Sequence, residues 1–306
     1  MNAVGFAKTV ILTHNLAMRR LLIIGCGDVA LRTIPLLIKG YRVYALVRNA
    51  GYFTRLRALG ALPLLGDLDD RNSLARISGI ADAILHFAPP PNSGIRDTRT
   101  HNLLSALSRD KLPSRMVYIS TSGVYGDCAG EWVSETRPLN ATSPRARRRV
   151  DAEQQIRSWA RRNHVNASIL RVPGIYAENR LPLSRLRQGT PGIISSEDGY
   201  TNHVHADDLA RIAVAALQRG QACRVYQASD DSRLKMGEYF DSVADAFGLP
   251  RVSRISRAEA QRVLPESLLS FMNESRRLTN RRLKKELKVR LRYPTVADML
   301  AAIRQP

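Results

Sequence analysis

The chain has 306 residues, of which 44% are hydrophobic and 24% are charged. These proportions are ordinary for a folded globular protein of one large or two modest domains, and they exclude global disorder and a fibrous architecture. Lys and Arg outnumber Asp and Glu by 47 to 27, but the cations are spread along the whole chain, so the net charge of +20 does not lead us to expect nucleic acid as a partner.

Cysteine spacing and the length of the apolar runs restrict the class of protein further. Cys26, Cys128 and Cys223 lie far apart without CxxC or Cys/His spacing, so we expect neither a disulfide framework nor a metal site, and a reduced, cytoplasmic location fits. No apolar run approaches the roughly 20 residues of a membrane-spanning helix, so no membrane is expected as a partner. Residues 1–19 lack the pattern of a signal peptide, and we expect an N-terminal extension there that can be disordered.

From residue 20 onward, short apolar runs alternate with longer amphipathic runs, which is typical of repeated βαβ units. Strands are predicted at residues 20–25, 42–48, 61–66, 81–88, 115–120 and 167–172. Helices are predicted at residues 28–39, 52–59, 69–78, 95–109 and 144–163. The alternation predicts an α/β protein in which residues 20–180 form a Rossmann-type, doubly wound parallel sheet of six strands.

The pattern changes after residue 180, where loop-rich stretches precede the next predicted helices. These helices are expected at residues 206–218, 235–247 and 256–272, with a last amphipathic helix in VADMLAAI, residues 296–303. The cations of the basic run SRRLTNRRLKKEL, residues 275–287, are expected to be solvated. Because no flexible linker interrupts the chain, residues 181–306 are predicted to form a smaller C-terminal subdomain packed on the first.

A glycine-rich turn follows the first predicted strand. The stretch GCGDVA fills the pattern G-x-G-x-x-[GA] with Gly25, Gly27 and Ala30. The first glycine permits a tight turn, the second lets a pyrophosphate approach the backbone, and the helix N-terminus faces the phosphates. The turn is therefore predicted to bind a dinucleotide through residues 25–29. These residues are Gly25, Cys26, Gly27, Asp28 and Val29.

The second and third predicted strands end at residues that would face the adenosine part of the dinucleotide. An acidic residue at the end of the second strand would bind the ribose 2′-hydroxyl of NAD, but this chain has Arg48 there. Arg48 favours NADP, with NAD as the alternative. In GDLDD, after the third strand, Asp67 can accept a hydrogen bond from the adenine amine and Leu68 can cover the ring.

Seven stretches in this order resemble the extended, epimerase-like branch of the short-chain dehydrogenase/reductase superfamily. The stretches are GCGDVA, GDLDD, LHFAPP, YISTSGVYGD, LRVPGIYAENR, NHVHADDLA and SRRLTNRRLKKEL. Together they cover nearly everything from residue 20 to the end. The combination is specific for the superfamily and much less so for one activity.

The resemblance implies roles for residues at the carboxyl ends of the later strands. Phe87 and Ala88 would line the cofactor, and residues 173–175 would contact its nicotinamide end. The latter residues are Pro173, Gly174 and Ile175. Thr121 takes the position of the catalytic Ser or Thr, counted back from VYG, in which Tyr125 is a structural residue.

The same resemblance exposes a departure from the superfamily. Its members carry a Y-x-x-x-K pair four residues ahead of a glutamate; the tyrosine moves the proton, and the lysine lowers the tyrosine's pKa and binds the nicotinamide ribose. Counting back from Glu153 places Arg149 at the lysine position and Arg145 at the tyrosine position. The chain therefore resembles atypical members that have lost this pair.

The positions of the arginines on helix 144–163 predict which of them face the site. At about 100° per residue, Arg145 and Arg149 share the inward face, Arg147 points to solvent, and Arg148 lies on the border. Arginine stays protonated, so neither inward residue can be a general acid or base. Arg149 can still hold the ribose or an anionic substrate.

Other residues that could move a proton each have a plainer interpretation. His203 and His205 fit the structural support of a substrate loop, and His86 at a strand end fits a packed, hydrogen-bonded histidine. Glu131 and Glu135 lie in the loop after VYGD, where we expect solvated carboxylates.

The sequence thus predicts an atypical short-chain dehydrogenase/reductase that binds NADP in preference to NAD. It would be an oxidoreductase or epimerase-like enzyme acting on a carbonyl or hydroxyl group of a small molecule, with Thr121, Arg149 and Arg145 in its catalytic site. The alternative is a non-catalytic, NADP-sensing regulatory protein. The resemblance also implies a homodimer that pairs through helix 144–163.

Overall fold

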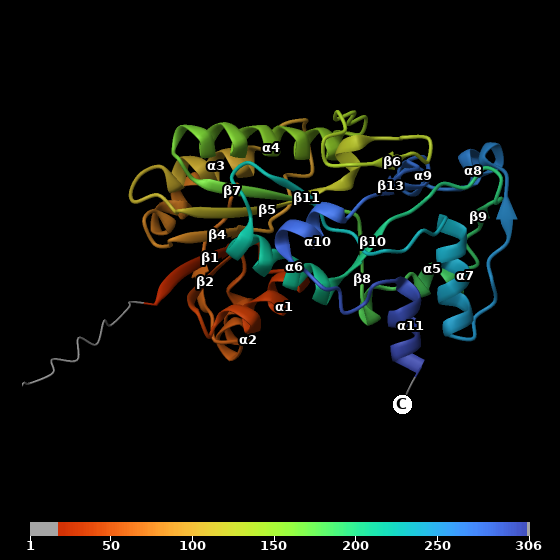
Figure 1. Cartoon of the computed structure of the whole chain (residues 1–306), viewed down its shortest axis with the longest axis horizontal. Helices are drawn as coiled ribbons and strands as arrows, with labels where there is room; N and C mark the ends of the chain where they lie inside the picture. The colour runs from red at the N-terminus through yellow and green to blue at the C-terminus, as the bar shows by residue number, and fades with distance from the viewer. Residues whose placement is uncertain (1–17, 305–306) are drawn as a thin grey trace, which may run out of the picture.

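The structure, a computed structural model, describes residues 18–304. Residues 1–17 of the predicted N-terminal extension lie outside the described residues, and Arg19, which the prediction placed in that extension, is the first residue of strand β1. Figure 1 shows a sheet between layers of helices and, beside it, a smaller, loop-rich part that contains the C-terminal end of the described chain. Among the described helices, none is long and apolar enough to cross a membrane.

A parallel sheet forms the centre of the described chain and contains seven strands. From edge to edge these are β11 (Val225–Gln227), β7 (Asn166–Val172), β5 (Arg115–Thr121), β4 (Ala83–His86), β1 (Arg19–Ile24), β2 (Tyr41–Val47) and β3 (Leu62–Leu65). The strand order reverses between β1 and β4, which leaves a crevice at their carboxyl ends. The predicted Rossmann-type α/β fold is confirmed.

The prediction of six strands is wrong, because β11 is a seventh. Its three residues pair in parallel with β7, and VYQ is too short for a periodic apolar pattern to stand out. Helix α6 (Ala206–Arg219) precedes β11 and packs against α1 (Asp28–Leu37). Both α6 and β11 lie beyond residue 180, and they complete the sheet and one of its helical layers.

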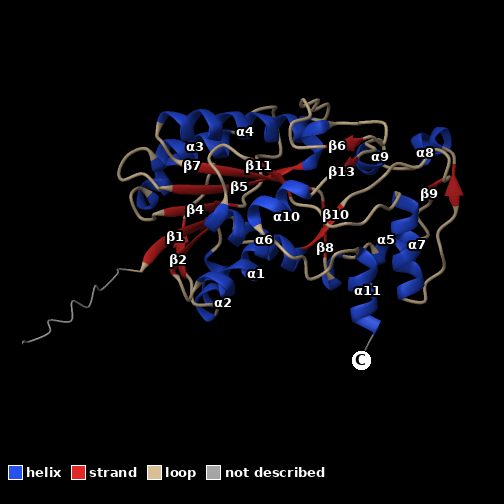
Figure 2. Cartoon of the chain, viewed as in Figure 1, coloured by secondary structure: helices blue, strands red, loops and turns tan. Residues whose placement is uncertain are grey.

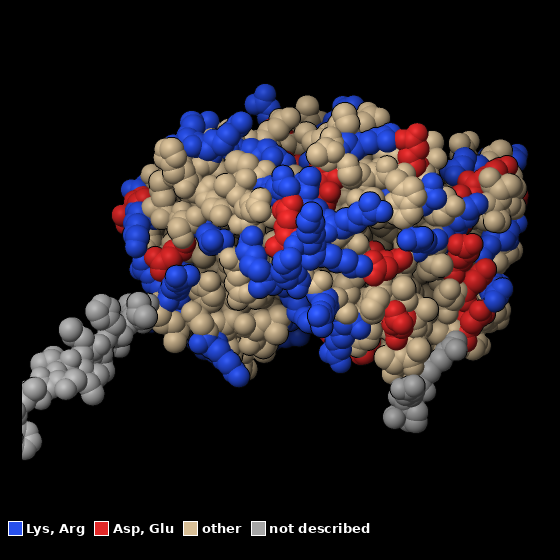
Figure 3. All heavy atoms as spheres, in the orientation of Figure 1, with Lys and Arg blue, Asp and Glu red and all other residues tan. Residues whose placement is uncertain are grey.

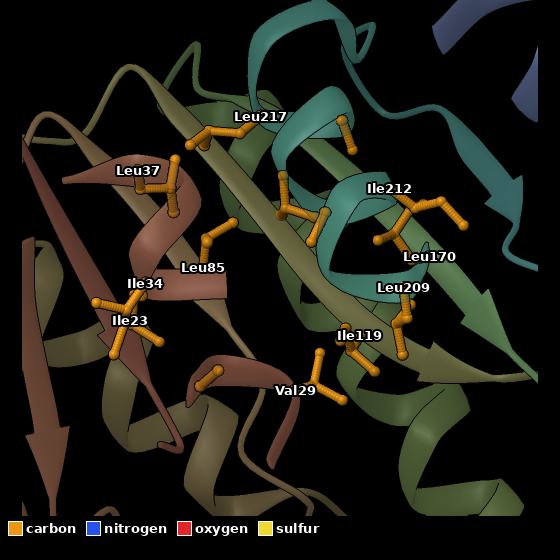
Figure 4. Packing of buried hydrophobic residues seen from close by; sticks show 14 of the residues in the cluster. Ile23, Val29, Ile34, Leu37, Leu85, Ile119, Leu170, Leu209, Ile212 and Leu217 are labelled. Atoms are coloured by element: carbon orange, nitrogen blue, oxygen red, sulfur yellow. The ribbon is translucent and has the colours of Figure 1, made fainter. Parts of the chain in front are cut away.

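Successive residues of β1 pack on opposite faces of the sheet, as a strand buried on both sides requires. Leu21 and Ile23 share a core cluster with residues of α1, α6 and α10 (Arg281–Leu287). Leu22 and Ile24 share another with residues of α3 (Thr98–Leu107) and α4 (Pro144–Arg162). Figure 2 shows α3 and α4 on the opposite side of the sheet from α1 and α6, and Figure 4 shows Ile23 and Ile34 within the first cluster.

Two of the predicted helices differ in the structure. The stretch predicted at 69–78 is a 3₁₀ segment, η2 (Arg71–Ile77), whose start is capped by Asp70 accepting from the backbone amide of Asn72. The helix predicted at 256–272 is two helices, α8 (Arg257–Val263) and α9 (Glu266–Met272). Pro265 separates them, because proline lacks an amide hydrogen and disfavours helical backbone in the residue before it.

The smaller part packs against the carboxyl edge of the sheet. Strand β8 (Gly174–Tyr176) follows β7 directly and pairs with β10 (His203–His205). Two more short pairs are β9 (Gly192–Ile193) with β12 (Arg254–Ile255) and β6 (Trp132–Val133) with β13 (Arg277–Leu278). A core cluster of its own joins α5 (Leu183–Arg187), α7 (Met236–Ala246) and α11 (Val296–Arg304).

The basic run at 275–287 corrects the expectation of solvated cations. Arg276 is buried, and Arg282 is half-buried beside Glu135 and Glu286. Lys284 is exposed and pairs with Asp231. Figure 3 shows Lys and Arg side chains gathered over α6 and α10, with Asp and Glu side chains beside them.

Candidate functional site

The turn after β1 can be made only by glycine at its first position. Gly25 has a φ of +87°, and a Cβ added to it would lie 2.4 Å from the backbone nitrogen of Ala88. Ala88 follows β4, which pairs directly with β1. The turn therefore combines left-handed backbone with a close approach to the neighbouring strand.

The second glycine of the turn faces open space instead. Gly27 is the N-cap of α1, makes no side-chain cap hydrogen bond, and has no described atom within 4 Å of the position that a Cβ would take. The first amides of a helix have no partner within the helix, so such an N-terminus is suited to an anion. The space over Gly27 thus fits a pyrophosphate.

The turn is the floor of a cleft of about 710 Å³, which we call the turn cleft. It brings together most of the residues predicted to bind a dinucleotide, namely Gly25, Cys26, Gly27, Val29, Arg48, Asp67, Leu68, Phe87, Ala88, Arg149 and Ile175. Asp28 does not line it. The carboxylate of Asp28 pairs with Arg32 at 3.1 Å and with Arg180 at 3.3 Å.

Two arginines lie at the far end of the turn cleft, where the adenosine part was expected. Arg48 is exposed at the end of β2, and Arg99 extends from α3. Arg99 forms two hydrogen bonds with Asp69, at 2.6 and 2.8 Å. Hydrogen bonding to Arg99, and then the charges of Arg99 and Arg48, hold the pKa of Asp69 below its usual value. No local motif marks Arg99, so its place in the cleft could not be predicted from the sequence.

A second cleft, of about 680 Å³, adjoins the first at Ile175, which lines both. We call it the Thr121 cleft. Pro173 and Gly174 line this cleft rather than the turn cleft, as do Thr121 and Arg145. The Thr121 hydroxyl accepts a hydrogen bond from the Gly123 amide at 3.2 Å, which fixes it at the start of the turn after β5.

Of the four arginines near the start of α4, one lines each cleft and two line neither. Arg149 lines the turn cleft, and its Nη1 donates to the Tyr118 hydroxyl at 2.9 Å and to the Ile119 carbonyl at 2.6 Å. Arg145, one turn earlier, lines the Thr121 cleft but is exposed, whereas the helical pattern placed it on the inward face. Arg147 is exposed, as predicted, whereas Arg148 is only 7% exposed and donates to the Gly94 carbonyl at 2.6 Å.

The arginine positions follow from how α4 begins and what lies under it. The Ser143 hydroxyl accepts from the Ala146 amide at 3.2 Å, which fixes the start of the helix. Lower on the same helix, buried Glu153 accepts from Arg171 at 2.7 and 3.1 Å and from Ser120 at 2.7 Å. Because Ser120 immediately precedes Thr121, its hydrogen bond to Glu153 sets α4 against the strand that carries Thr121.

The residues considered for proton transfer are mostly placed elsewhere. His86 is fully buried, hydrogen-bonds Thr100 at 3.0 Å, and has a pKa lowered to about 3, chiefly by burial. His205 accepts from the Asp207 amide at the start of α6. His203 does line the Thr121 cleft, but burial lowers its pKa to about 4, so it is neutral at pH 7.

The two glutamates of the loop after VYGD differ from each other. Glu131 is exposed and pairs with Arg137, as expected of a solvated carboxylate. Glu135 corrects that expectation, because it is 8% exposed and accepts from the Gln227 amide at 3.3 Å. Neither residue lines the Thr121 cleft.

The Thr121 cleft also contains charged residues that sequence analysis did not connect with it. They are Arg180, Arg185, Glu274 and Arg276. Arg180 precedes α5, Arg185 lies in α5, and the other two residues follow α9. These segments are far from β5 in the sequence, so only the folded structure brings them near it. Within residues 18–304, no group of His, Cys, Asp and Glu is arranged to hold a metal ion.

Comparisons with known proteins bear on the family and the fold of the chain. The model of the family described as NAD dependent epimerase/dehydratase matches residues 32–228. A dTDP-glucose 4,6-dehydratase of Mycobacterium tuberculosis is 26% identical in an alignment 188 residues long that covers 54% of this chain and 56% of that protein. The chain therefore spans little more than half the length of this relative.

Solved structures resemble almost the whole chain. A conserved, functionally unknown protein from Silicibacter pomeroyi is 28% identical with a TM-score of 0.76, covering 94% of this chain and 98% of that one. DesIV, a dTDP-glucose 4,6-dehydratase from Streptomyces venezuelae with NAD and TYD bound, has a TM-score of 0.73 at 22% identity, covering 94% and 96%. At that identity the second likeness shows the fold alone.

Proposed function

The chain belongs to the NAD-dependent epimerase/dehydratase family, and on that basis we propose that it binds NADP in the turn cleft and oxidises or reduces a small molecule in the Thr121 cleft. The reacting group would be a carbonyl or a hydroxyl. The observation that carries the proposal is that the two clefts meet at Ile175, with Arg149 in one and Thr121 in the other.

The space over Gly27 leaves room for the dinucleotide in the turn cleft, since a Cβ added to Gly27 would meet no described atom. Backbone amides at the start of α1 would hold the pyrophosphate, and Asp67 and Leu68 would contact the adenine. When bound, the nicotinamide supplies or accepts a hydride. The 2′-phosphate of NADP would lie near Arg48, and this cation supports NADP over NAD. Arg99 is already paired with Asp69.

Protein groups in the Thr121 cleft would bind and orient the substrate. The Thr121 hydroxyl can donate to a carbonyl oxygen or accept from a hydroxyl group. Arg149 keeps its orientation through Tyr118 and Ile119, and its remaining N–H groups can hold the ribose. Neither Arg149 nor Arg145 can transfer a proton, because guanidinium stays charged.

The inability of Arg145 and Arg149 to transfer a proton also supports a second candidate function, a non-catalytic protein that senses NADP. Of the five residues considered for proton transfer, only His203 lines the Thr121 cleft, and its low pKa makes it a poor acid at pH 7. A sensor would need the turn cleft and no proton donor.

Calorimetric titration with NADPH and NADH tests the shared premise. We expect micromolar binding of NADPH and weaker binding of NADH, whereas absence of heat with either at near-millimolar concentration would exclude both functions. Turnover on aldehydes, ketones and nucleotide sugars separates an enzyme from a sensor.

The double substitution Arg145→Tyr with Arg149→Lys tests the enzyme further. It introduces the tyrosine in the Thr121 cleft and the lysine in the adjoining turn cleft, as in the family's proton-transfer pair, so we expect reductase activity to appear or to increase. Unchanged inactivity with intact NADPH binding would favour the sensor.

A further inference from the structure

Cations that are spread along the sequence are gathered on one face of the folded chain. Helix α10 and its C-terminal cap residue turn a row of three cations outward, Arg281, Lys285 and Lys288, spaced by four and three residues. All three are exposed, while Leu283 and Leu287 on the inner side of α10 are buried. Figure 3 shows the resulting concentration of Lys and Arg side chains over α6 and α10.

The segment after α10, with the sequence KVRLR, continues this row of cations. Val289 and Leu291 pack in the core cluster that contains residues of α6, whereas Lys288, Arg290 and Arg292 are exposed. Because inward and outward residues alternate, as in an extended strand, the cations of the segment face away from the core. The cations of α10 and of this segment thus form one row that follows the chain.

Contacts at both ends of α6 hold the segment along this helix. Arg219, at the carboxyl end of α6, donates from Nε to the Leu287 carbonyl at 2.7 Å. Asp208, near the start of α6, is buried and accepts from the backbone amides of Arg292 and Tyr293 at 2.7 and 2.8 Å. Arg219 is itself exposed, so its guanidinium joins the row. We call the following residues the basic strip: Arg219, Arg281, Lys285, Lys288 and Arg290.

Carboxylates close to the basic strip are already paired with other cations. Glu286 of α10 binds Arg224, and Asp231 binds Lys284. Within residues 18–304, no member of the basic strip forms an ion pair with a carboxylate. The two members inside α10 are four residues apart, where like charges repel each other. The strip therefore presents uncompensated positive charge, which a polyanion would stabilise.

The composition of this surface indicates which polyanion fits. Among the described residues of α6, α10 and the segment 288–292, no large hydrophobic side chain is exposed. Protein partners and single-stranded nucleic acids are usually anchored by aromatic side chains, and membrane surfaces by apolar residues that insert. The phosphate backbone of a duplex is bound by cations alone. Residues 281–288 span about 10 Å, and a duplex carries one charge for about every 1.7 Å of its axis, so several phosphates fit.

We propose that the basic strip binds the phosphate backbone of duplex nucleic acid without reading its base sequence. The Lys and Arg side chains replace counterions that are condensed on the duplex, and the release of these ions drives association. No member of the strip lines the turn cleft or the Thr121 cleft. The proposal therefore does not depend on the proposed function, and failure of either leaves the other standing.

Fluorescence anisotropy of a labelled DNA duplex of about 20 base pairs, measured from about 50 to 200 mM salt, tests the strip. We expect saturable binding by the wild type, equal for duplexes of unrelated sequence and weaker as salt rises. Lys288→Gln with Arg290→Gln removes two exposed cations and should weaken binding at low salt by at least about fivefold. The slope of log affinity against log salt should become shallower by about 2, since each phosphate contact contributes about 0.9.

A charge-matched variant separates the strip from the net charge of the protein. Arg147→Gln with Arg161→Gln removes two exposed cations from α4, on the opposite side of the sheet, and should change affinity less than about twofold. Thermal unfolding checks that both double variants are folded. Equal weakening by the two, or no duplex binding by the wild type at about 50 mM salt, would overturn the proposal. Tighter binding of a single strand of the same length, or of phosphatidylserine vesicles, would overturn it in favour of that partner.

Discussion

At the scale of single residues, alanine substitutions at the two glycines of the turn are expected to affect stability differently. Gly25→Ala forces a left-handed backbone on alanine and drives its Cβ into Ala88. We expect the free energy of unfolding to fall by about 2 kcal/mol or more. Gly27→Ala meets no atom of the fold, so stability should stay within about 1 kcal/mol of wild type.

The affinity for NADPH tests the role of Gly27 separately from stability. In Gly27→Ala the added methyl would occupy the space assigned to the pyrophosphate, and we expect NADPH binding to weaken by at least about tenfold. Thermal unfolding and calorimetry measure the two effects. A Gly27→Ala protein that binds NADPH like wild type would place the pyrophosphate elsewhere.

Arg48 provides the residue-scale test of cofactor choice. Arg48→Glu reverses the charge expected near the 2′-phosphate, so we expect the preference for NADPH over NADH to fall by about tenfold or more. Arg42→Glu is a matched control, since Arg42 is exposed at the start of the same strand, away from the turn cleft. Equal, small effects of Arg48→Glu on both nucleotides would remove the assignment of NADP.

Site residues could be predicted wherever a local rule governs them. Gly25 and Gly27 follow from the geometry of one turn, and Arg48 follows from its place at the end of one strand. Arg99 and Arg276 could not be found in this way. Their positions depend on how α3 and the segment after α9 pack against distant strands, which no short motif encodes.

At the scale of elements, the buried ion pair between α4 and β7 should be a main support of the site. Glu153 and Arg171 are 1% and 4% exposed and lie 2.7 Å apart. Glu153→Gln leaves the Arg171 charge buried without its counter-ion, so we expect a loss of about 3 kcal/mol in the free energy of unfolding.

An exposed pair in the same protein is the control for this prediction. Glu131 pairs with Arg137 at the surface, and Glu131→Gln should cost less than about 1 kcal/mol. Urea unfolding of both variants measures the difference. Equal costs would mean that the Glu153–Arg171 pair contributes no more than a surface contact.

Elements were predicted well where the sequence repeats a pattern over many residues. Long helices such as α1, α4 and α6 carry an apolar stripe for several turns, and their bounds fall close to the prediction. Strand β11 has three residues and no pattern of its own, and it is a strand because β7 offers a free edge. Pro265 was the available sign that the helix at 256–272 would be divided.

At the scale of the whole molecule, buried histidines should make the protein sensitive to acid. Burial lowers the pKa of His86 to about 3 and that of His203 to about 4, against roughly 6.5 in an unfolded chain. Between pH 4 and 6.5 the unfolded state therefore binds more protons, and stability falls as the pH falls. Each histidine contributes at most about 1.4 kcal/mol per pH unit.

Asp230 acts in the opposite direction over the same range. Burial raises its pKa to about 7, so the folded state binds the extra proton and gains stability as the pH falls. Burial likewise raises the pKa of Asp97 and Asp198 and lowers that of His205, so the prediction concerns the share of His86 in the pH dependence between pH 6.5 and 4.5. Urea unfolding across this range should show a shallower loss for His86→Gln, and identical slopes in both proteins would contradict the prediction.

The place of β11 in the sheet matters during synthesis on the ribosome. Six neighbouring strands have emerged by residue 172, while the strand that covers the edge of β7 is still more than 50 residues away. The nascent chain thus carries a hydrophobic, unpaired strand edge until β11 has also left the ribosome, and an edge of this kind readily pairs with other chains. Chaperone binding is accordingly most needed in that interval.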